Sequence, residues 1–181
     1  MDSNITALII AVVGIIGTLS SALLTQRSAN NSKIRELERA DEQRREERLY
    51  QAQSAAIEAR RTCCAALNTA ARLYQTELTN YLHALNAGDL AAELGERVEE
   101  ARLEHRARHS EAQMILPDPV LTSAGAVNGH LGRLYGVLKR LDFGNPEPGE
   151  TLAVAEAMRA ASWDLLAEMR AVMRRDLGVA P

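Results

Sequence analysis

Two histidines have the spacing most suggestive of chemistry in this chain. His105 and His109 stand four residues apart in the stretch "EHRARH", so a helix would carry both rings on one face, at a spacing that can bind a metal ion. The stretch is strongly charged, and no Glu-x-x-His pattern of the kind found in di-iron bundles accompanies it. We therefore expect the two rings to lie on a solvated helix face rather than in a metal site.

The cysteines are adjacent, at Cys63 and Cys64. Adjacent side chains point about 100° apart on a helix, so we expect only one of them to face a core. The sequence has no C-x-x-C spacing, which argues against a zinc site or a redox pair. His83 and His130 are isolated in the sequence. The ordinary interpretation of all these side chains is therefore structural.

Motifs of the common enzyme classes do not occur. The sequence holds no phosphate-binding Gly-rich loop, no G-x-S-x-G nucleophile elbow and no H-E-x-x-H zinc motif. A formal net charge of −3 gives no basic excess for binding nucleic acid. We therefore predict a protein that is not an enzyme and uses no cofactor and no metal. No small-molecule substrate is evident, so the expected partners are the membrane, another protein or further copies of the chain.

Four glycines in "GAVNGHLGRLYG" form the most unusual pattern: Gly125, Gly129, Gly132 and Gly136. Steps of four, three and four residues place them on one helical face, although each costs about 1 kcal/mol relative to alanine in a helix interior. Three interpretations stay open. The face packs tightly against another helix of the same domain, it is a seam where a partner helix docks, or it is simply a solvated face.

An apolar segment near the start indicates a membrane anchor. The residues from Ile5 to Leu24 include no charge, and twenty helical residues span about 30 Å, the thickness of the bilayer hydrocarbon. Ser20–Ala22 resembles a cleavage site, but the missing basic start and the length argue for a retained span over a signal peptide. A buried helix of a soluble domain is the remaining alternative, disfavoured because every face is apolar or small.

Basic residues after the span set its expected direction: Arg27, Lys33, Arg35 and Arg39. The positive-inside rule then predicts a cell-membrane protein with its N-terminus outside and its C-terminal domain in the cytoplasm. Within the span, Gly17 and Ser21 form a small-xxx-small pair near Gly14. These three residues are candidates for helix packing in the membrane.

A charged stretch separates the span from the remaining chain. After the polar joint Ser28–Ser32, residues 33–48 hold six basic and six acidic side chains. Zero net charge argues against binding to anionic lipid, which requires clustered basic residues. We expect a solvated helical stalk that continues into the next helix, since no proline interrupts residues 32–87.

Apolar residues at three- and four-residue spacing predict four further helices, over about 57–87, 90–116, 119–142 and 151–177. Gly88 and Gly178 suit left-handed helix ends, whereas Asp89 and Asp118 suit N-caps. The second helix is the most polar, and we expect it to pack most loosely. The expected stripes include Ile57, Cys64, Leu67, Ala71, Tyr74, Leu78, Tyr81, Leu85, then Leu90, Leu94, Val98 and Ala101, then Val120, Ala124, Val127, Leu131, Leu134, Leu138 and Leu141, and then Leu152, Ala155, Met158, Leu165, Met169 and Val172, with Trp163 and Leu166 flanking the last.

Short connections between these helices predict an antiparallel four-helix bundle. The expected fold class is all-α, with an N-terminal transmembrane helix, a long charged helical stalk and the bundle. The expected domains are an anchor at residues 1–27, the joint and stalk at 28–56 and the bundle at 57–181.

The stretches "IIAVVGIIGTLSSALLTQR", "DEQRREERLYQA" and "MRAVMRRDLG" carry a resemblance. The chain resembles a loose set of uncharacterised actinobacterial small membrane proteins, over most of its length. The resemblance implies an uncleaved span, an Arg/Glu-rich helix and a helical domain. It implies no activity and no functional residue.

The leading functional hypothesis is a single-pass membrane anchor that displays a cytoplasmic helical bundle for protein–protein docking or self-assembly. The alternative is an envelope protein whose bundle faces outward, as a ligand sensor or a phage-lysis, spanin-like subunit. The basic side chains that follow the span disfavour that alternative.

Overall fold

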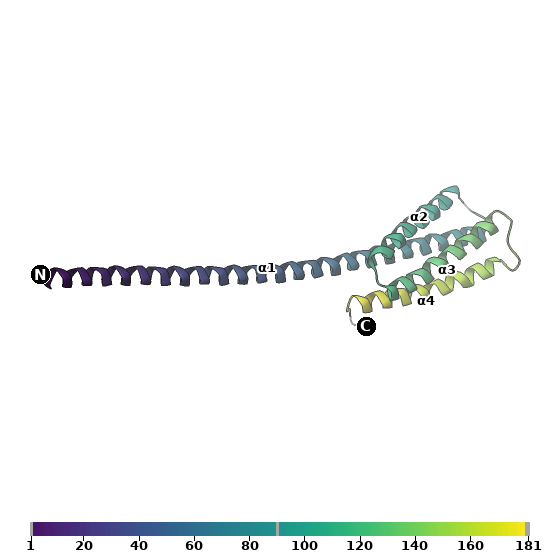
Figure 1. Cartoon of the computed structure of the whole chain (residues 1–181). Helices are drawn as coiled ribbons and strands as arrows, with labels where there is room; N and C mark the ends of the chain where they lie inside the picture. The colour runs from purple at the N-terminus through teal and green to yellow at the C-terminus, as the bar shows by residue number, and fades with distance from the viewer. Residues whose placement is uncertain (1, 90, 180–181) are drawn as a thin grey trace. The chain divides into compact units, whose positions relative to one another are not determined.

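The structure, a computed structural model, is all-α in the part of the chain that it describes (Figure 1). Side chains are described at residues 33, 36–37, 39–89 and 91–179. The helices are α1 Asp2–Ala87, α2 Ala92–Ile115, α3 Asp118–Asp142 and α4 Leu152–Asp176, and no strand occurs among the described residues. The predicted all-α class is confirmed.

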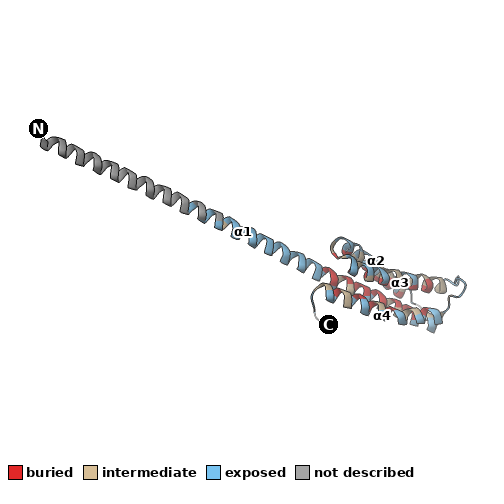
Figure 2. Ribbon diagram, turned by 60° about the horizontal axis from the view of Figure 1, so that its bottom comes forward, coloured by how far each residue is buried: buried red, intermediate tan, exposed pale blue. Residues whose placement is uncertain are grey.

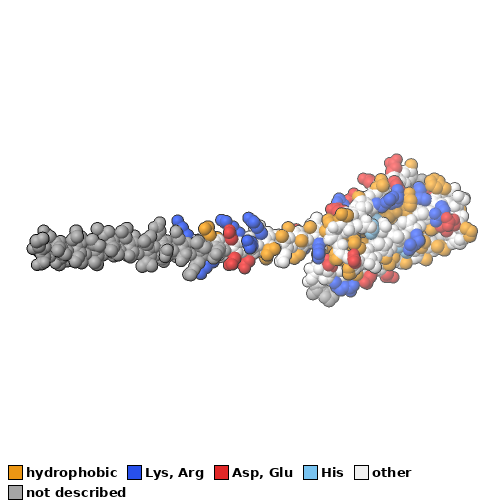
Figure 3. Space-filling model, in the orientation of Figure 1, with side chains coloured by type: hydrophobic (Ala, Val, Ile, Leu, Met, Phe, Trp, Pro, Cys, Tyr) orange, Lys and Arg blue, Asp and Glu red, His pale blue; other side chains and the backbone are white. Residues whose placement is uncertain are grey.

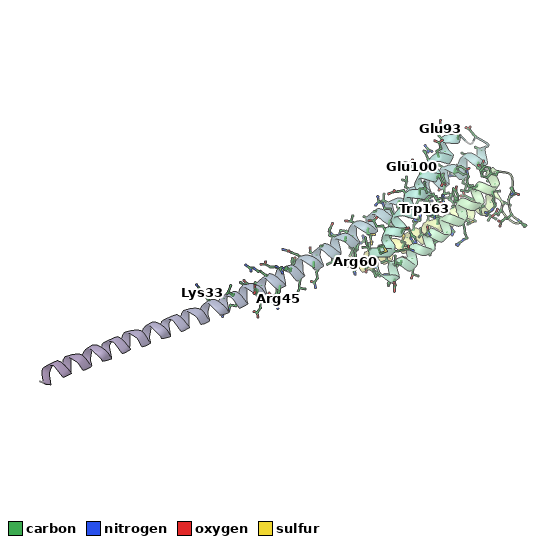
Figure 4. The ribbon with its side chains drawn as sticks, turned by 45° about the horizontal axis from the view of Figure 1, so that its top comes forward. Lys33, Arg45, Arg60, Glu93, Glu100 and Trp163 are labelled. Atoms are coloured by element: carbon green, nitrogen blue, oxygen red, sulfur yellow. The ribbon has the colours of Figure 1, made fainter. Side chains whose placement is uncertain are left out.

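The chain divides into two compact units, residues 1–54 and 55–181. The division falls close to the boundary at 56/57 that the sequence predicts between stalk and bundle. In the first unit, the described side chains of residues 41–50 are all exposed, and Asp41 pairs with Arg44 at 3.6 Å. Lys33 and Arg45 project from α1 in Figure 4. The described part of the charged stretch is therefore solvated.

Several predictions fall outside the residues whose side chains the structure describes: the span Ile5–Leu24, the joint Ser28–Ser32, the packing candidates Gly14, Gly17 and Ser21, and the stripe residue Leu90. Among the described residues, no helix combines the length and the apolar character needed to cross a bilayer.

The second unit is a bundle whose four helical segments bury their apolar faces in one core (Figure 2). The predicted stripe of α3 is buried from Val120 to Leu138, and α1 contributes Leu67, Tyr74 and Leu78. Each fully buried leucine stabilises such a core by roughly 1.5–3 kcal/mol. The backbones of α3 and α4 approach closely along their length, whereas α2 and α3 approach much less. The expectation that α2 packs most loosely of all four helices stays a prediction.

Two predicted positions in the stripes are wrong. Ile57 is exposed, because the buried part of α1 begins only at Cys63, more than one helical turn further along the chain. On α4, Leu166 is buried rather than flanking, as are Ser162 and Met173. The 3.6-residue period lets a buried stripe drift around a long helix, so the flank of one turn becomes the core position of another.

The predicted glycine C-caps agree with the structure, whereas the predicted aspartate N-caps do not. Gly88 and Gly178 adopt positive φ, and Asp89 N–H donates to the Ala84 carbonyl at 3.1 Å, as in a Schellman C-cap. Asp89 does not cap α2, which has Ala91 at its N-cap position and no side-chain cap. Asp118 is the first residue of α3 rather than its N-cap, so the helix begins one residue before the predicted start at Pro119.

Polar contacts also join the helices of the bundle. Tyr81 Oη on α1 donates to Asp142 Oδ2 at 2.6 Å and accepts from Lys139 Nζ at 2.9 Å. His130 Nε2 donates to the Met158 carbonyl at 2.7 Å and so ties α3 to α4. These bonds satisfy polar groups that would otherwise be costly to bury.

Candidate functional site

A groove runs along the bundle surface between α1 and α2. It consists of two contiguous hollows of about 930 and 650 Å³ that share Leu73 and Glu104. Its lining includes apolar side chains, mostly alanines: Ala65, Ala66, Ala70, Leu73, Ala101, Leu103 and Ala107. Because alanine adds little bulk beyond the backbone, the two helices leave a hollow between them. We call this surface the α1–α2 groove.

Two leucines of the α1–α2 groove remain partly in water. Leu73 is 49% exposed and Leu103 is 55% exposed, and they come from facing helices. Figure 3 shows hydrophobic side chains reaching the bundle surface between charged ones. Full burial of a leucine is worth roughly 1.5–3 kcal/mol, so covering the exposed half of each side chain would contribute about 1 kcal/mol.

Charged side chains, mostly negative, make up much of the remaining lining. Six glutamates and three arginines line the groove: Glu58, Glu77, Glu96, Glu99, Glu100, Glu104, Arg61, Arg97 and Arg108. Glu77 Oε2 and Arg97 Nε pair across the two helices at 3.3 Å. Glu96 and Glu100 make no ion pair among the described residues, and Figure 4 places Glu100 along α2 with Glu93. The lining carries three more negative than positive charges.

A group of aromatic side chains lies between α1 and α2, deeper in the bundle. The Tyr74 and His105 rings stack with centroids 5.6 Å apart, and the His109 ring lies 6.3 Å from that of His105. Tyr74 Oη, His105 Nε2 and His109 Nδ1 are buried with no hydrogen-bond partner among the described residues. Such atoms are uncommon, because an unpaired buried polar group costs about 1–3 kcal/mol. We call these three residues the Tyr–His cluster.

The prediction of a solvated face is wrong for His105, which is only 1% exposed. It continues the buried stripe of α2 one turn beyond Val98 and Ala101. That helical spacing was the available signal, and the charged neighbours obscured it. Among the described residues, no third His, Cys, Asp or Glu joins the two histidines in a metal-binding group.

Burial keeps the Tyr–His cluster neutral. It lowers the pKa of His105 to about 4, and the nearby His109 acts in the same direction. Burial also lowers the pKa of His109 and raises the pKa of the Tyr74 hydroxyl. At pH 7 the cluster therefore presents hydrogen-bonding atoms that carry no charge.

A charged network borders the cluster. Arg102 Nε donates to Glu99 Oε2 at 2.8 Å, and Tyr135 Oη of α3 donates to the same oxygen at 2.9 Å. The bond from Arg102, followed by that from Tyr135, holds the pKa of Glu99 below its usual value against the opposing effect of burial. The Arg102 guanidinium also lies 5.1 Å from the centre of the Tyr135 ring. The network thus connects α2 to α3 with an ionised Glu99.

A pocket of about 300 Å³ opens beside the cluster and the network, between α1, α2 and α3. Its lining is Tyr74, Arg102, His105, Arg106, Asn128, Gly132 and Tyr135. We call it the three-helix pocket. The sequence offered one indirect signal for it, which is the glycine at position 132.

The four glycines of α3 do not pack against another helix among the described residues: Gly125, Gly129, Gly132 and Gly136. A Cβ at Gly125 or Gly132 would have no heavy atom within 4 Å. A Cβ at Gly129 or Gly136 would meet only the guanidinium groups of Arg133 and Arg140, at 3.5 and 3.3 Å. The structure therefore does not have the tight internal packing that was one interpretation, and the docking seam stays a prediction.

Both cysteines are buried, so the expectation that only one faces the core is wrong. The carboxylate of Glu111 on α2 interacts electrostatically with the Cys63 thiol, and that of Asp176 on α4 interacts with the Cys64 thiol. Helices cover α1 on two sides, so positions 100° apart are both enclosed. Burial raises the pKa of both thiols, that of Cys64 to about 11, which makes them poor nucleophiles at neutral pH.

Searches of protein-family models, of curated proteins and of solved structures give no match to this chain.

Proposed function

We propose that the protein is a membrane-anchored docking module whose α1–α2 groove binds an amphipathic helix of a partner protein. The observation that supports this proposal most is the groove itself. Its lining combines alanines with two leucines that are about half exposed, and glutamates outnumber arginines in it. Hydrophobic grooves that bind amphipathic helices are a recurring mode of peptide recognition.

Charge and length specify the occupant. The two groove glutamates without an ion pair among the described residues, Glu96 and Glu100, favour a helix that carries Lys or Arg beside its apolar stripe, because complementary charge guides association and fixes register. Groove-lining residues on α1 run from Glu58 to Glu77, about 28 Å of helix at 1.5 Å per residue. That length accommodates roughly five turns of a bound helix.

The anchor is the second part of the proposal. Ile5–Leu24 supplies an uncharged segment of sufficient length for one span, and the basic residues from Arg27 onward favour a cytoplasmic bundle. A reporter enzyme fused after Pro181 tests this direction. Activity of a cytoplasm-only reporter is expected, whereas activity of an export-only reporter would favour the alternative envelope protein with an outward-facing bundle.

A synthetic peptide tests the groove. The full-length chain in detergent is titrated with a labelled helix of about twenty residues, with leucines at i, i+3, i+4 and i+7 and lysines beside them. We expect saturable binding, followed by fluorescence anisotropy, that weakens as salt rises. The double variant Leu73→Gln, Leu103→Gln should bind about tenfold or more weakly, because two exposed apolar contacts are lost.

Two controls make the result specific. Val154→Gln alters an exposed apolar residue of α4 outside the groove and should leave the affinity unchanged. A peptide with glutamates in place of the lysines should not bind. Equal binding of both peptides, or equal loss in the groove and Val154 variants, would contradict the proposal. If the groove substitutions instead dissociate an oligomer of the chain in sedimentation, the occupant is a second copy and not a partner helix.

A further inference from the structure

The three-helix pocket has properties that the docking function does not use. It lies between α1, α2 and α3, and two of its lining residues, Arg102 and Tyr135, also belong to the charged network around Glu99. Its volume of about 300 Å³ lies at the lower end of the range for small-molecule sites. It is therefore large enough for a compact organic molecule.

Two lining residues carry polar atoms that lack partners inside the protein. Tyr74 is 2% exposed and His105 is 1% exposed, and neither Tyr74 Oη nor His105 Nε2 has a hydrogen-bond partner among the described residues. A core that needed only stability would be better served by phenylalanine at such positions, because an unpaired buried polar group is unfavourable. A bound molecule would supply the missing partners.

The charged lining favours an anion. The charge of Arg102 is balanced by Glu99, with which it forms two hydrogen bonds. Arg106 makes no ion pair among the described residues, and its positive charge acts on the Tyr74 hydroxyl. Asn128 adds an amide that can donate. One uncompensated guanidinium beside neutral donors is an arrangement that binds carboxylates and phosphates.

Gly132 forms part of the pocket wall on α3. A Cβ there would meet no heavy atom within 4 Å, so the space next to this glycine is open. Any larger side chain would extend into that space. Glycine at position 132 costs about 1 kcal/mol of helix stability relative to alanine, and it leaves this side of the pocket open.

We propose that the three-helix pocket binds a small molecule carrying one carboxylate or phosphate group, with the anion held by Arg106, the Tyr74 hydroxyl and Asn128. The partly exposed ring of Tyr135 offers apolar surface to the remainder of the molecule. A site of this kind would make the bundle responsive to a metabolite, separately from the α1–α2 groove.

The experiment titrates the full-length chain in detergent with benzoate and, separately, with inorganic phosphate. Binding is followed by calorimetry and by the NMR signals of isotope-labelled tyrosine and histidine rings. We expect one of the two probes to bind saturably at millimolar concentrations and to shift the Tyr74 and His105 signals. Preference for benzoate identifies a carboxylate ligand, and preference for phosphate identifies a phosphate ester.

Four variants distinguish the pocket from the general surface. Arg106→Gln and Tyr74→Phe should each weaken binding about tenfold or more, although the phenylalanine variant should fold as well as the parent. Gly132→Leu should block the pocket. Arg170→Gln removes the same charge from an exposed position on α4 that does not line the pocket, and should bind normally.

Three outcomes would overturn the proposal. Neither probe saturates at tens of millimolar. The Arg106 and Arg170 variants lose affinity equally, which would mean binding to surface arginines only. The Tyr74→Phe and Gly132→Leu variants retain the affinity of the parent protein, which would place the anion elsewhere.

Discussion

Replacing His105 by phenylalanine should remove a pH dependence that this buried imidazole imposes on the bundle. The ring is 1% exposed, and its pKa is lowered to about 4 by burial and by His109. In the unfolded chain the same group has a pKa of about 6.5. Between these two values the unfolded state binds more protons, so the free energy of unfolding must fall as the pH falls.

The magnitude follows from the two pKa values. The folded and unfolded pKa values of His105 differ by about 2.5, and each pKa unit corresponds to about 1.36 kcal/mol. The free energy of unfolding should therefore fall by about 3 kcal/mol between pH 7 and pH 4. The loss is complete only below the folded pKa. The groups that face or border the imidazole are Tyr74 of α1, Arg102, Arg106 and His109 of α2, and Tyr135 of α3. Of these, only His109 titrates in the same range, and burial lowers its pKa in the same direction.

The assay is urea unfolding of the full-length chain, followed by fluorescence of the single tryptophan, Trp163. This residue is 44% exposed and lies beneath the Arg72 guanidinium, so it reports on the α1–α4 packing of the bundle. Phenylalanine can keep the stacking on Tyr74 without the unpaired nitrogen, so the variant should be at least as stable at pH 7. Carboxylates titrate alike in both proteins and cancel in the comparison.

We expect the stability difference between His105→Phe and the parent to grow by about 3 kcal/mol from pH 7 to pH 4. Parallel stability curves over that interval would show that His105 does not cause the pH dependence. They would mean that the imidazole is accessible to water in the folded protein.

Two further predictions concern the core and α3. Leu131→Asp places a charge at a fully buried position and should abolish the cooperative thermal transition, whereas Met114→Asp, at an exposed position, should change stability by less than about 0.5 kcal/mol. A cooperative melt that Leu131→Asp leaves unchanged would contradict the bundle. Gly125→Ala should raise stability by about 1 kcal/mol in urea unfolding, because the added Cβ meets no atom within 4 Å. A loss of stability there would show that an unseen contact covers this face.

Helical periodicity was enough to predict the bundle. The stripe on α3 is strongly apolar, and its buried residues from Val120 to Leu138 follow the expected spacing. Gly88 and Gly178 end their helices as predicted, since positive φ is nearly free of strain only for glycine. The predictions therefore agreed best with the structure for residue types that have one dominant physical preference, such as aliphatic side chains in a core and glycine at positive φ.

The site was harder to predict for physical reasons. His105 is polar and has charged neighbours, yet its angular position on α2 places it in the core. The α1–α2 groove depends on which alanines of two distant segments face each other, and single-helix periodicity does not contain that information. Similarly, the glycines of α3 suggested a close approach, whereas the structure leaves Gly132 beside an open pocket.

A charge swap in the α1–α2 groove tests most directly whether the groove binds a basic amphipathic helix. Glu96 and Glu100 are exposed, line the groove and make no ion pair among the described residues, so Glu96→Lys, Glu100→Lys should preserve the fold. This full-length variant should lose affinity for the lysine-bearing amphipathic peptide and gain affinity for its glutamate-bearing counterpart. Unchanged preference for the lysine peptide would contradict the claim that the groove selects a basic helix.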